Sequence, residues 1–418
     1  MWALIRLAMP VGFRRNEKCI FANNSSAGRV LFAAGVSRSR SIAVRKRRAL
    51  LRPEGEQVDG VQDEKDGIFR SVVFAHLTVF PIFLMQLLSH KDNNFDFLRI
   101  AAAFGVLVSH QFSLTGRPEP VMLGVSLGGF CVLVFFAISG FLVAGSWMHD
   151  PSAWRFAVRR LLRIWPGLLV ACVLVVLVLG PMVSQLGLRE YFASPLTWNY
   201  LSQLSFWEFK SQLPGVFASN PIPESANGSL WTIPIEIRCY LALMVVGVLG
   251  LMRRNFLLPL AFVVFAIWFF FLFKTGYDQP IRMQLQMGVV FFCAAAMYQL
   301  RALWQSRRLW IWVVAVAAIL LLWHGGMPEI AYTLGVPVIV VLFGTGSLPV
   351  LKRAGRFGDV SYGLYIYAYP VQQTVIWLSD NRLPFGWGLG LATLITTVLA
   401  WFSWKLIEQP ALRLKNRL

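Results

Sequence analysis

Two ionisable side chains lie inside an apolar stretch early in the sequence. Arg99 and His110 occur in "FDFLRIAAAFGVLVSHQF", which is otherwise apolar enough to enter a membrane. They are eleven residues apart, which in an α-helix is three turns plus roughly 20°, so both would lie on one face about 16 Å apart. An ionisable side chain at the centre of a bilayer costs at least ~2.5 kcal/mol, so it usually faces a protein interior, a wet cavity or a partner. The pair therefore predicts a polar site within a membrane protein.

His110 is the residue of this stretch that is suited to general-base work near neutral pH. Each member of the pair also has a structural interpretation. His110 could be satisfied by a neighbouring helix, and Arg99 could be an anchor that extends to the interface. Asp96, one turn before Arg99, could pair with it and hold it in place.

A second candidate site is the basic segment "RFAVRRLLRIWP". Arg160 and Arg163 are one turn apart on a helix and face the same way, with Arg159 beside them. The planar guanidinium is permanently charged and suits phosphate, so two on one face suit a pyrophosphate or a phosphorylated nucleotide. The alternative is that these arginines only anchor the segment on the cytoplasmic side.

A carboxylate in the middle of another apolar stretch is the third candidate. Glu236 lies in "NGSLWTIPIEIRCYLALM", with Arg238 close by. A buried carboxylate is expensive unless it is paired or functional. Pro234 could loosen the helix where a cavity is lined. A structural ion pair, with Arg238 or with another helix, is the competing interpretation.

The composition indicates what kind of protein must position these residues. Of the 418 residues 57% are hydrophobic and 14% are charged, and the mean hydropathy is +0.60. Soluble domains are nearer a quarter charged, so the chain is expected to be an all-α, polytopic integral membrane bundle. The net charge of +19 comes from residues clustered between apolar runs, which excludes a nucleic-acid-binding stripe. No metal-ligand spacing and no phosphate-binding glycine loop occur.

About ten membrane spans of suitable length follow Phe95. The predicted spans are 95–113, 123–146, 164–182, 230–250, 256–273, 283–300, 309–323, 330–347, 358–379 and 385–406. Alternate connections are rich in Lys and Arg, which predicts that they are cytoplasmic and that both ends of the ten-span core lie inside. The expected location is the inner (cytoplasmic) membrane.

The first 84 residues differ from the rest. They contain basic clusters such as "RKRRALLRPEGEQ". This composition predicts a basic, disordered extension before a membrane domain at 85–418. The stretch 71–88 is either an extra membrane segment or sequence upstream of a true start at Met85. Because an eleventh span would set basic segments on competing sides, ten spans are favoured.

Several sequence segments within about residues 92–412 together resemble the motifs of one known family. The spacing of Arg99 and His110, the segment "FFAISGFL", the pair Arg160 and Arg163, and "SLWTIPIEIRCY" each match a motif of acyltransferase family 3. "IRMQLQMG", "SYGLYIYAYP" and "IEQP" match further motifs in the same order. These membrane enzymes O-acylate lipopolysaccharide O-antigen, exopolysaccharide and other extracytoplasmic substrates. The chain departs from the pattern where Ile237 replaces a second glutamate and where Ala368 or Tyr369 replaces a histidine.

The resemblance implies an enzyme, a membrane-bound O-acyltransferase that uses acyl-CoA, most often acetyl-CoA, as co-substrate. The acceptor would be a hydroxyl of a cell-surface or lipid-linked glycan. The implied catalytic residues are His110, Arg99 and Glu236, with His110 as general base or transient acyl carrier. The implied donor-binding residues are Arg160, Arg163 and Arg282, and the structural or site-lining residues are Ser139, Gly140, Trp231 and Tyr362.

Two functions of other classes remain as alternatives. A transporter or lipid-carrier flippase would use Arg99, His110 and Glu236 as a polar pathway. Transporter folds often contain internal repeats, and no convincing repeat relates residues 95–250 to 256–406. A non-catalytic membrane subunit would need His110 and Glu236 to be packing partners only.

Overall fold

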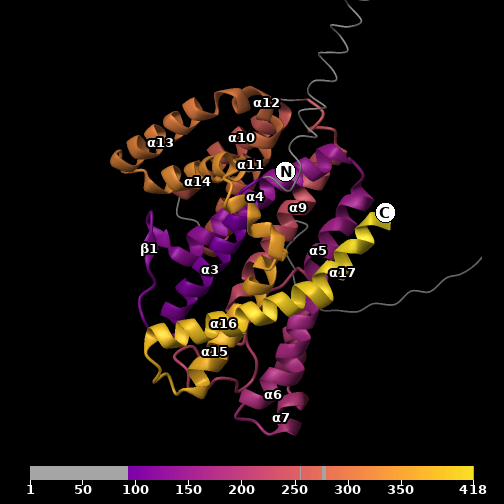
Figure 1. Ribbon diagram of the computed structural model, residues 1–418, viewed down its shortest axis with the longest axis vertical. Coiled ribbons are helices and arrows are strands. Elements are labelled where there is room, and N and C mark those ends of the chain that lie inside the picture. The colour runs from indigo at the N-terminus through magenta and orange to yellow at the C-terminus, as the bar shows by residue number, and fades with distance from the viewer. Residues whose placement is uncertain (1–92, 255, 275–278, 418) are drawn as a thin grey trace, which may run out of the picture. The chain divides into compact units, whose positions relative to one another are not determined.

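The computed structural model describes residues 93–254, 256–274 and 279–417. The predictions for the extension 1–84 and for the stretch 71–88 lie outside the described residues. The described residues are mostly helical, and their long helices pack side by side (Figure 1). The long helices are α3 (Phe95–Leu114), α4 (Leu127–His149), α5 (Ala153–Leu174), α9 (Ile233–Val248), α10 (Leu257–Lys274), α11 (Gln279–Gln299), α13 (Arg308–His324), α14 (Pro328–Gly344), α15 (Ser361–Leu378) and α16 (Phe385–Ser403).

Short elements connect the long helices. They are β1 (Val121–Met122), β2 (Val125–Ser126), the π-helix η1 (Val175–Leu179), α6 (Gly180–Val183), α7 (Leu188–Ala193), α8 (Pro195–Asn199), η2 (Tyr200–Ser205), η3 (Gly228–Thr232), α12 (Arg301–Trp304), η4 (Gln305–Arg307), η5 (Leu351–Phe357), the π-helix η6 (Trp404–Glu408), α17 (Gln409–Arg413) and η7 (Leu414–Arg417). The two strands form an antiparallel hairpin in which Val121 pairs with Ser126.

A helix lies in each of the ten predicted ranges. Within the described part of the chain, seven helical stretches are long and apolar enough to cross a membrane. Leu257–Phe271 and Pro328–Gly344 are apolar but shorter. Large apolar side chains are exposed on several helices, and α13 has no buried residue, which is typical of a surface that faces lipid. These features are those of a polytopic membrane protein, and the number of spans stays a prediction.

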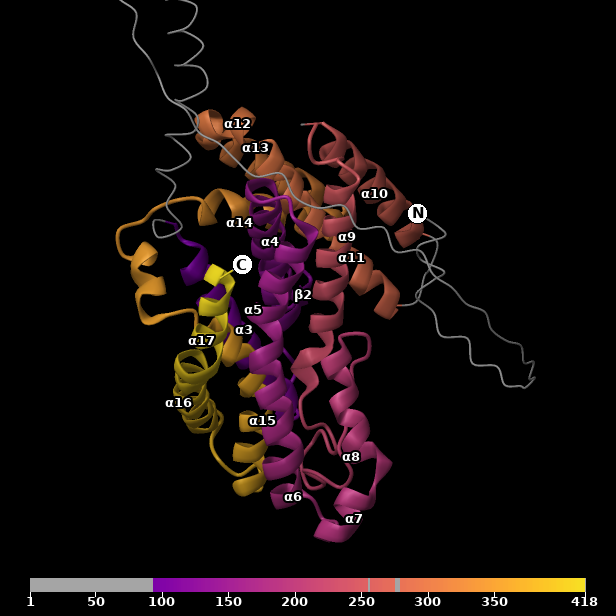
Figure 2. The ribbon, with the colours of Figure 1, turned by 90° about the vertical axis from the view of Figure 1, so that its right-hand side faces the viewer.

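Helix α4 occupies the core of the bundle. It packs against α3, α9, α11 and α14, and most of its residues are buried. Gly140 permits the approach of α11, because a Cβ atom at Gly140 would lie 2.1 Å from the backbone oxygen of Phe291. Figure 2 shows α16 and α17 on one side of this core and α10 on the other.

Helix α5 begins earlier than predicted. The predicted span starts at residue 164, whereas the helix starts at Ala153, where the side chain of Ser152 caps it by accepting a hydrogen bond from the Arg155 amide. It continues through η1 and α6 as one apolar stretch, Ala153–Val183. The basic residues of the segment therefore lie on the helix itself, which packs against α9, α15 and η6.

The long connection between α6 and α9 is fixed to α15 by buried hydrogen bonds. Asn220 donates to the side chain of Gln373 at 2.8 Å, and Asn227 donates to the carbonyl of Ile366 at 2.8 Å. Ser225 and Tyr369 share a hydrogen bond of 2.9 Å between their hydroxyls. This connection is thus an ordered cap over one end of the bundle.

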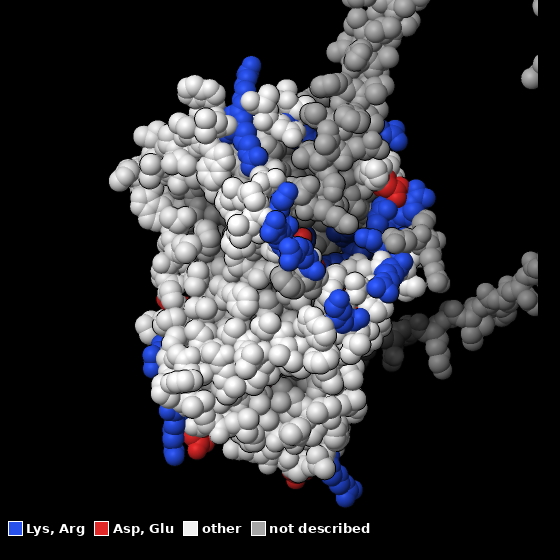
Figure 3. All heavy atoms as spheres, in the orientation of Figure 1, with Lys and Arg blue, Asp and Glu red and all other residues white. Residues whose placement is uncertain are grey.

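The visible surface is largely uncharged. Figure 3 shows most of its Lys and Arg side chains in the upper half, and only a few below. An uneven distribution of this kind is what the positive-inside rule requires of a membrane protein.

Candidate active site

A cavity lies between α3, α4, α5, α9 and α15. The space inside it, open mouth included, is about 810 Å³. The polar side chains that line it come from five helices and from η3. They are Arg99, Ser139, Arg160, Arg163, Thr232, Glu236, Tyr240, Ser361, Tyr362 and Tyr365.

The spacing of the basic residues on α5 decides which of them face the cavity. Arg160 and Arg163 both line it, whereas Arg159 points to the connection between α4 and α5. There Asp150 accepts hydrogen bonds from Arg155 at 2.6 Å and from Arg159 at 2.7 Å. The hydrogen bonds from these two arginines hold the pKa of Asp150 well below its usual range, and the bond from Arg155 has the larger effect. Asp150 is therefore ionised at neutral pH and keeps Arg159 out of the cavity.

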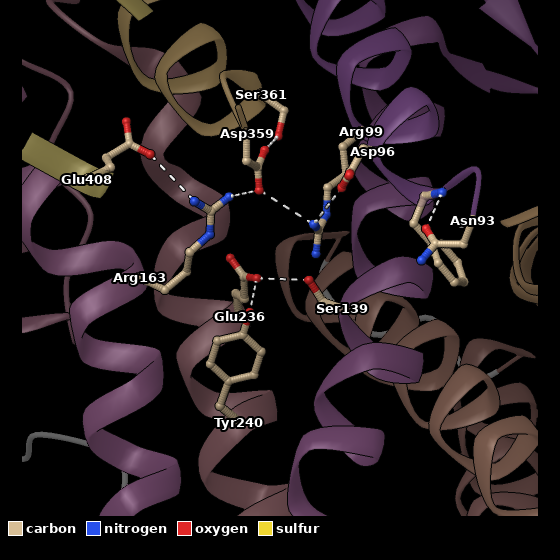
Figure 4. Close-up of polar contacts among 11 residues, drawn as sticks. Asn93, Asp96, Arg99, Ser139, Arg163, Glu236, Tyr240, Asp359, Ser361 and Glu408 are labelled. Atoms are coloured by element: carbon tan, nitrogen blue, oxygen red, sulfur yellow. Dashed lines mark hydrogen bonds and ion pairs between the residues drawn. The ribbon is translucent and has the colours of Figure 1, made fainter. Parts of the chain in front are cut away.

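A network of ion pairs surrounds two of the cavity arginines (Figure 4). One carboxylate oxygen of Asp359, which lies just before α15, accepts hydrogen bonds from both Arg99 and Arg163. Arg99 also lies 3.7 Å from Asp96, the partner predicted from their spacing. Arg163 reaches the buried Glu408 of η6 at 3.5 Å. The network joins α3, α5, α15 and η6 by charge as well as by packing.

Two carboxylates of this network, Asp359 and Glu408, are also held by a serine. Ser361 donates to the other oxygen of Asp359, and Ser403 donates to Glu408 at 3.0 Å. Asp359 and Glu408 were not among the predicted site residues. "IEQP", which contains Glu408, matches a family motif but by itself indicates no partner, and no spacing rule connects Asp359 to residues 196 and 260 positions earlier.

Glu236 lies in the first turn of α9 and points into the cavity (Figure 4). Its carboxylate accepts hydrogen bonds from Ser139 of α4 at 3.0 Å and from the hydroxyl of Tyr240. Arg238 faces away and donates to Gln284 at 2.9 Å and to the carbonyl of Trp207. Among the described contacts none joins Glu236 to Arg238, so the structure does not support the interpretation of these two residues as an ion pair.

His110 lies apart from the cavity, near the other end of α3. Its ring makes an edge contact with Tyr369, with 5.3 Å between the ring centroids. Beside it, Ser109 donates to Glu119 at 2.6 Å and accepts from the amide of Gly128 at 2.8 Å. Among the described contacts none joins His110 to Glu236, so the expectation that Glu236 orients His110 receives no support from the geometry.

Tyrosines of α15 lie between the cavity and His110. Tyr365 lines the cavity, and Tyr369, one turn further along the helix, contacts His110. The hydroxyl of Tyr365 bonds with that of Thr232 at 2.6 Å and donates to the carbonyl of Ser229. The ring of Phe135 packs against Tyr365 with 5.8 Å between centroids. These rings, Phe135, Tyr365 and Tyr369, which we call the aromatic partition, thus lie between the cavity and His110.

The remaining predicted site residues have varied positions. Tyr362 lines the cavity, donates to the carbonyl of Ile164 at 2.8 Å and lies under the guanidinium of Arg163. Trp231 packs against the core, and Gly140 is the α4–α11 contact described above. Arg282, on α11, lies 3.7 Å from Glu329 of α14 and is not among the cavity-lining residues.

The donor atoms for a metal ion are not gathered anywhere in the described part of the chain. No group of three or more His, Cys, Asp and Glu side chains there could hold one. The ionisable and polar groups of the cavity are guanidinium, carboxylate and hydroxyl groups.

Comparisons with known proteins identify the class of protein to which this chain belongs. Residues 92–405 match the model of a family described as an acyltransferase domain. The chain is 34% identical over 339 residues to an O-acetyl transferase of Shigella phage Sf6, covering 77% of this chain and 96% of that protein. It is 29% identical over 367 residues to nodulation protein 10 of Rhizobium leguminosarum bv. viciae, covering 79% and 96% of the two chains. No solved structure gives a significant match.

These matches extend over most of the helical bundle and over the cavity residues. The chain belongs to acyltransferase family 3, as its motifs suggested, and it is a membrane acyltransferase.

Proposed function

We propose that the protein transfers an acetyl group from acetyl-CoA to a hydroxyl of a cell-surface or lipid-linked glycan. Family membership supports acyl transfer, and the similarity to a phage O-acetyl transferase supports an acetyl group and an oxygen acceptor. The single observation that carries the proposal is the cavity in which three arginines lie near the carboxylate of Glu236. A cationic wall of this kind suits the phosphates of a coenzyme A thioester.

The donor is proposed to enter from the end of the bundle where α5 begins. That end carries Arg155 and Arg159 as well as the cavity arginines, and the positive-inside rule makes it cytoplasmic. Acyl-CoA made in the cytoplasm would then place its phosphates in the arginine-lined cavity and extend its pantetheine arm past Tyr365. The acetyl group would reach the side of the partition where His110 lies.

His110 is the proposed centre of acyl transfer. In direct transfer it takes the proton of the sugar hydroxyl while that oxygen bonds to the acetyl carbon; the carbon–sulfur bond breaks and coenzyme A leaves as a thiolate that recovers the proton. In the second route a ring nitrogen of His110 bonds to the acetyl carbon while the carbon–sulfur bond breaks and coenzyme A leaves as a thiolate. The sugar oxygen then bonds to the acetyl carbon, the carbon–nitrogen bond breaks, and the hydroxyl proton goes to the freed imidazole. The edge contact with Tyr369 would fix the position of its ring in both routes.

The proposal is tested by following acetyl-labelled coenzyme A into polysaccharide in membranes with matched amounts of intact protein or variant. His110→Ala is expected to lower transfer by about 10²–10⁴-fold, the usual contribution of a general base. The matched control is His149→Ala, because His149 is an exposed histidine at the far end of α4. Normal turnover by His110→Ala would remove His110 from the chemistry.

The same experiment addresses the transport alternative. Polysaccharide left unlabelled by folded intact protein, with donor and acceptor both present, would exclude the proposed transferase activity under those conditions. It would favour a transporter in which Arg99, His110 and Glu236 form a polar pathway.

A further inference from the structure

The three arginines of the cavity differ in their ionic partners. Arg163 is engaged by two carboxylates, Asp359 and Glu408, and Arg99 by Asp96 and Asp359. Both guanidinium groups are therefore neutralised within the protein. The serine hydroxyls on Asp359 and Glu408 fix these carboxylates further.

Arg160 has no such partner. Among the described residues no carboxylate lies within ion-pair distance of it, and its Nε is buried without a hydrogen-bond partner. Two aromatic rings flank its guanidinium, those of Phe156 and Tyr240, each with its centroid 5.9 Å away. Arg99, Arg159 and Arg163 add positive charge around it, and Glu236, which lines the same cavity, is held by Ser139 and Tyr240. Arg160 is thus the cavity arginine that has no ion-pair partner among the described residues.

This difference has a physical consequence for ligand binding. A guanidinium desolvated in a membrane interior is costly unless an anion compensates it, and a bound phosphate would do so. Arg163 does not require a bound anion, because Asp359 and Glu408 already compensate its charge. For Arg163 to bind a phosphate in bidentate geometry, it would first have to give up Asp359 or Glu408, and loss of the contact with Glu408 would leave a buried carboxylate without a cation.

We propose that Arg160 is the arginine that binds a phosphate of the acyl donor, whereas Arg163 is a positioning residue. Asp359 and Glu408 hold Arg163 between α5, the start of α15 and η6, and this arrangement fixes the turn of α5 that presents Arg160. The assignment rests on the proposed function, because it takes the anionic ligand to be a coenzyme A thioester.

The test compares two single variants with a double variant in purified protein, by coenzyme A binding, thermal unfolding and donor and acceptor KM. Arg160→Gln is expected to weaken coenzyme A binding by roughly ten- to a hundredfold and to raise the KM of the donor alone, with Tm unchanged. Arg163→Gln leaves Glu408 buried without its cation, so a lower Tm is expected.

The double variant Arg163→Gln with Glu408→Gln keeps the assignment testable if Arg163→Gln does not fold. Removing both charges leaves no unpaired ion at this contact, so we expect most of the Tm to return and coenzyme A affinity to stay within about twofold of the intact protein. A stable double variant that binds coenzyme A as poorly as Arg160→Gln would show that Arg163 contacts the donor, which would overturn the assignment.

Two other results would count against the assignment in different ways. Arg160→Gln with lowered Tm and unchanged coenzyme A affinity would make Arg160 structural. Intact, folded protein that does not bind coenzyme A would overturn the proposed donor itself, and not only the division of roles between the two arginines.

Discussion

At the scale of residues, the cavity carboxylate and the histidine must have separate tasks. Glu236 bonds with Ser139 and Tyr240 on the cavity side of the aromatic partition, and His110 lies beyond Tyr369 on the other side. We infer that Glu236 acts on the donor's part of the site. A carboxylate there could orient the pantetheine arm through its hydrogen bonds, and it opposes the positive charge of the arginines.

Glu236→Gln tests this role, because glutamine keeps the size of the side chain and removes its charge. We expect kcat to fall by roughly ten- to a hundredfold, since hydrogen bonds to a charged group contribute about 1.5–3 kcal/mol. The control is Arg238→Gln, two residues away on the exposed side of α9, where kcat is expected to change little. Equal rates for the two variants in the labelled-acetyl assay would refute a role for Glu236 in the reaction.

At the scale of elements, close helix packing determines the shape of the cavity. Ser139, which binds Glu236, is followed by Gly140, where α4 touches the backbone of α11. A change at this contact would move α4 and with it one wall of the cavity. The family motif "FFAISGFL" thus combines a packing residue with a cavity residue in adjacent positions.

Gly140→Ala is expected to destabilise the bundle. The added Cβ would lie 2.1 Å from the Phe291 oxygen, and backbone cannot move aside as a side chain can. Overpacking of this kind costs about 1–3 kcal/mol, so a lower Tm and reduced activity are expected in thermal unfolding and transfer assays. Gly390→Ala on α16 is the control, since nothing lies within 4 Å of its added Cβ and its Tm should not fall. An unchanged Tm for Gly140→Ala would mean that α4 and α11 adjust freely.

The sequence predicts the elements better than their contacts. Apolar length places a helix in every predicted range, because a bilayer requires long apolar segments. Helical spacing also places Arg160 and Arg163 on one face and Asp96 beside Arg99. Asp359 and Glu408 could not be predicted, because they reach Arg163 across 196 and 245 residues of chain. Spacing within one helix likewise cannot show that His110 and Glu236 lie on opposite sides of a partition made by α15.

At the scale of the whole molecule, the proposed reaction depends on orientation in the membrane. In the proposed reaction acyl-CoA enters beside Arg160, and the glycan approaches from the side of His110 and the connection between α6 and α9. The two ends of the bundle must therefore face different compartments. The alternation of basic connections predicts which end is cytoplasmic.

Cysteine labelling with a membrane-impermeant maleimide measures this orientation. Lys210→Cys, in the exposed connection between α6 and α9, is expected to react in intact cells, whereas Arg353→Cys in η5 should react only after the membrane is permeabilised. Little background labelling is expected, because the native cysteines of the described residues are buried: Cys131, Cys172, Cys239 and Cys293. Cys19 lies outside the described residues and is replaced by serine in both variants. The reverse pattern would place the arginine cavity on the side away from the cytoplasm, where acyl-CoA is not made, and the proposed donor route would have to be abandoned.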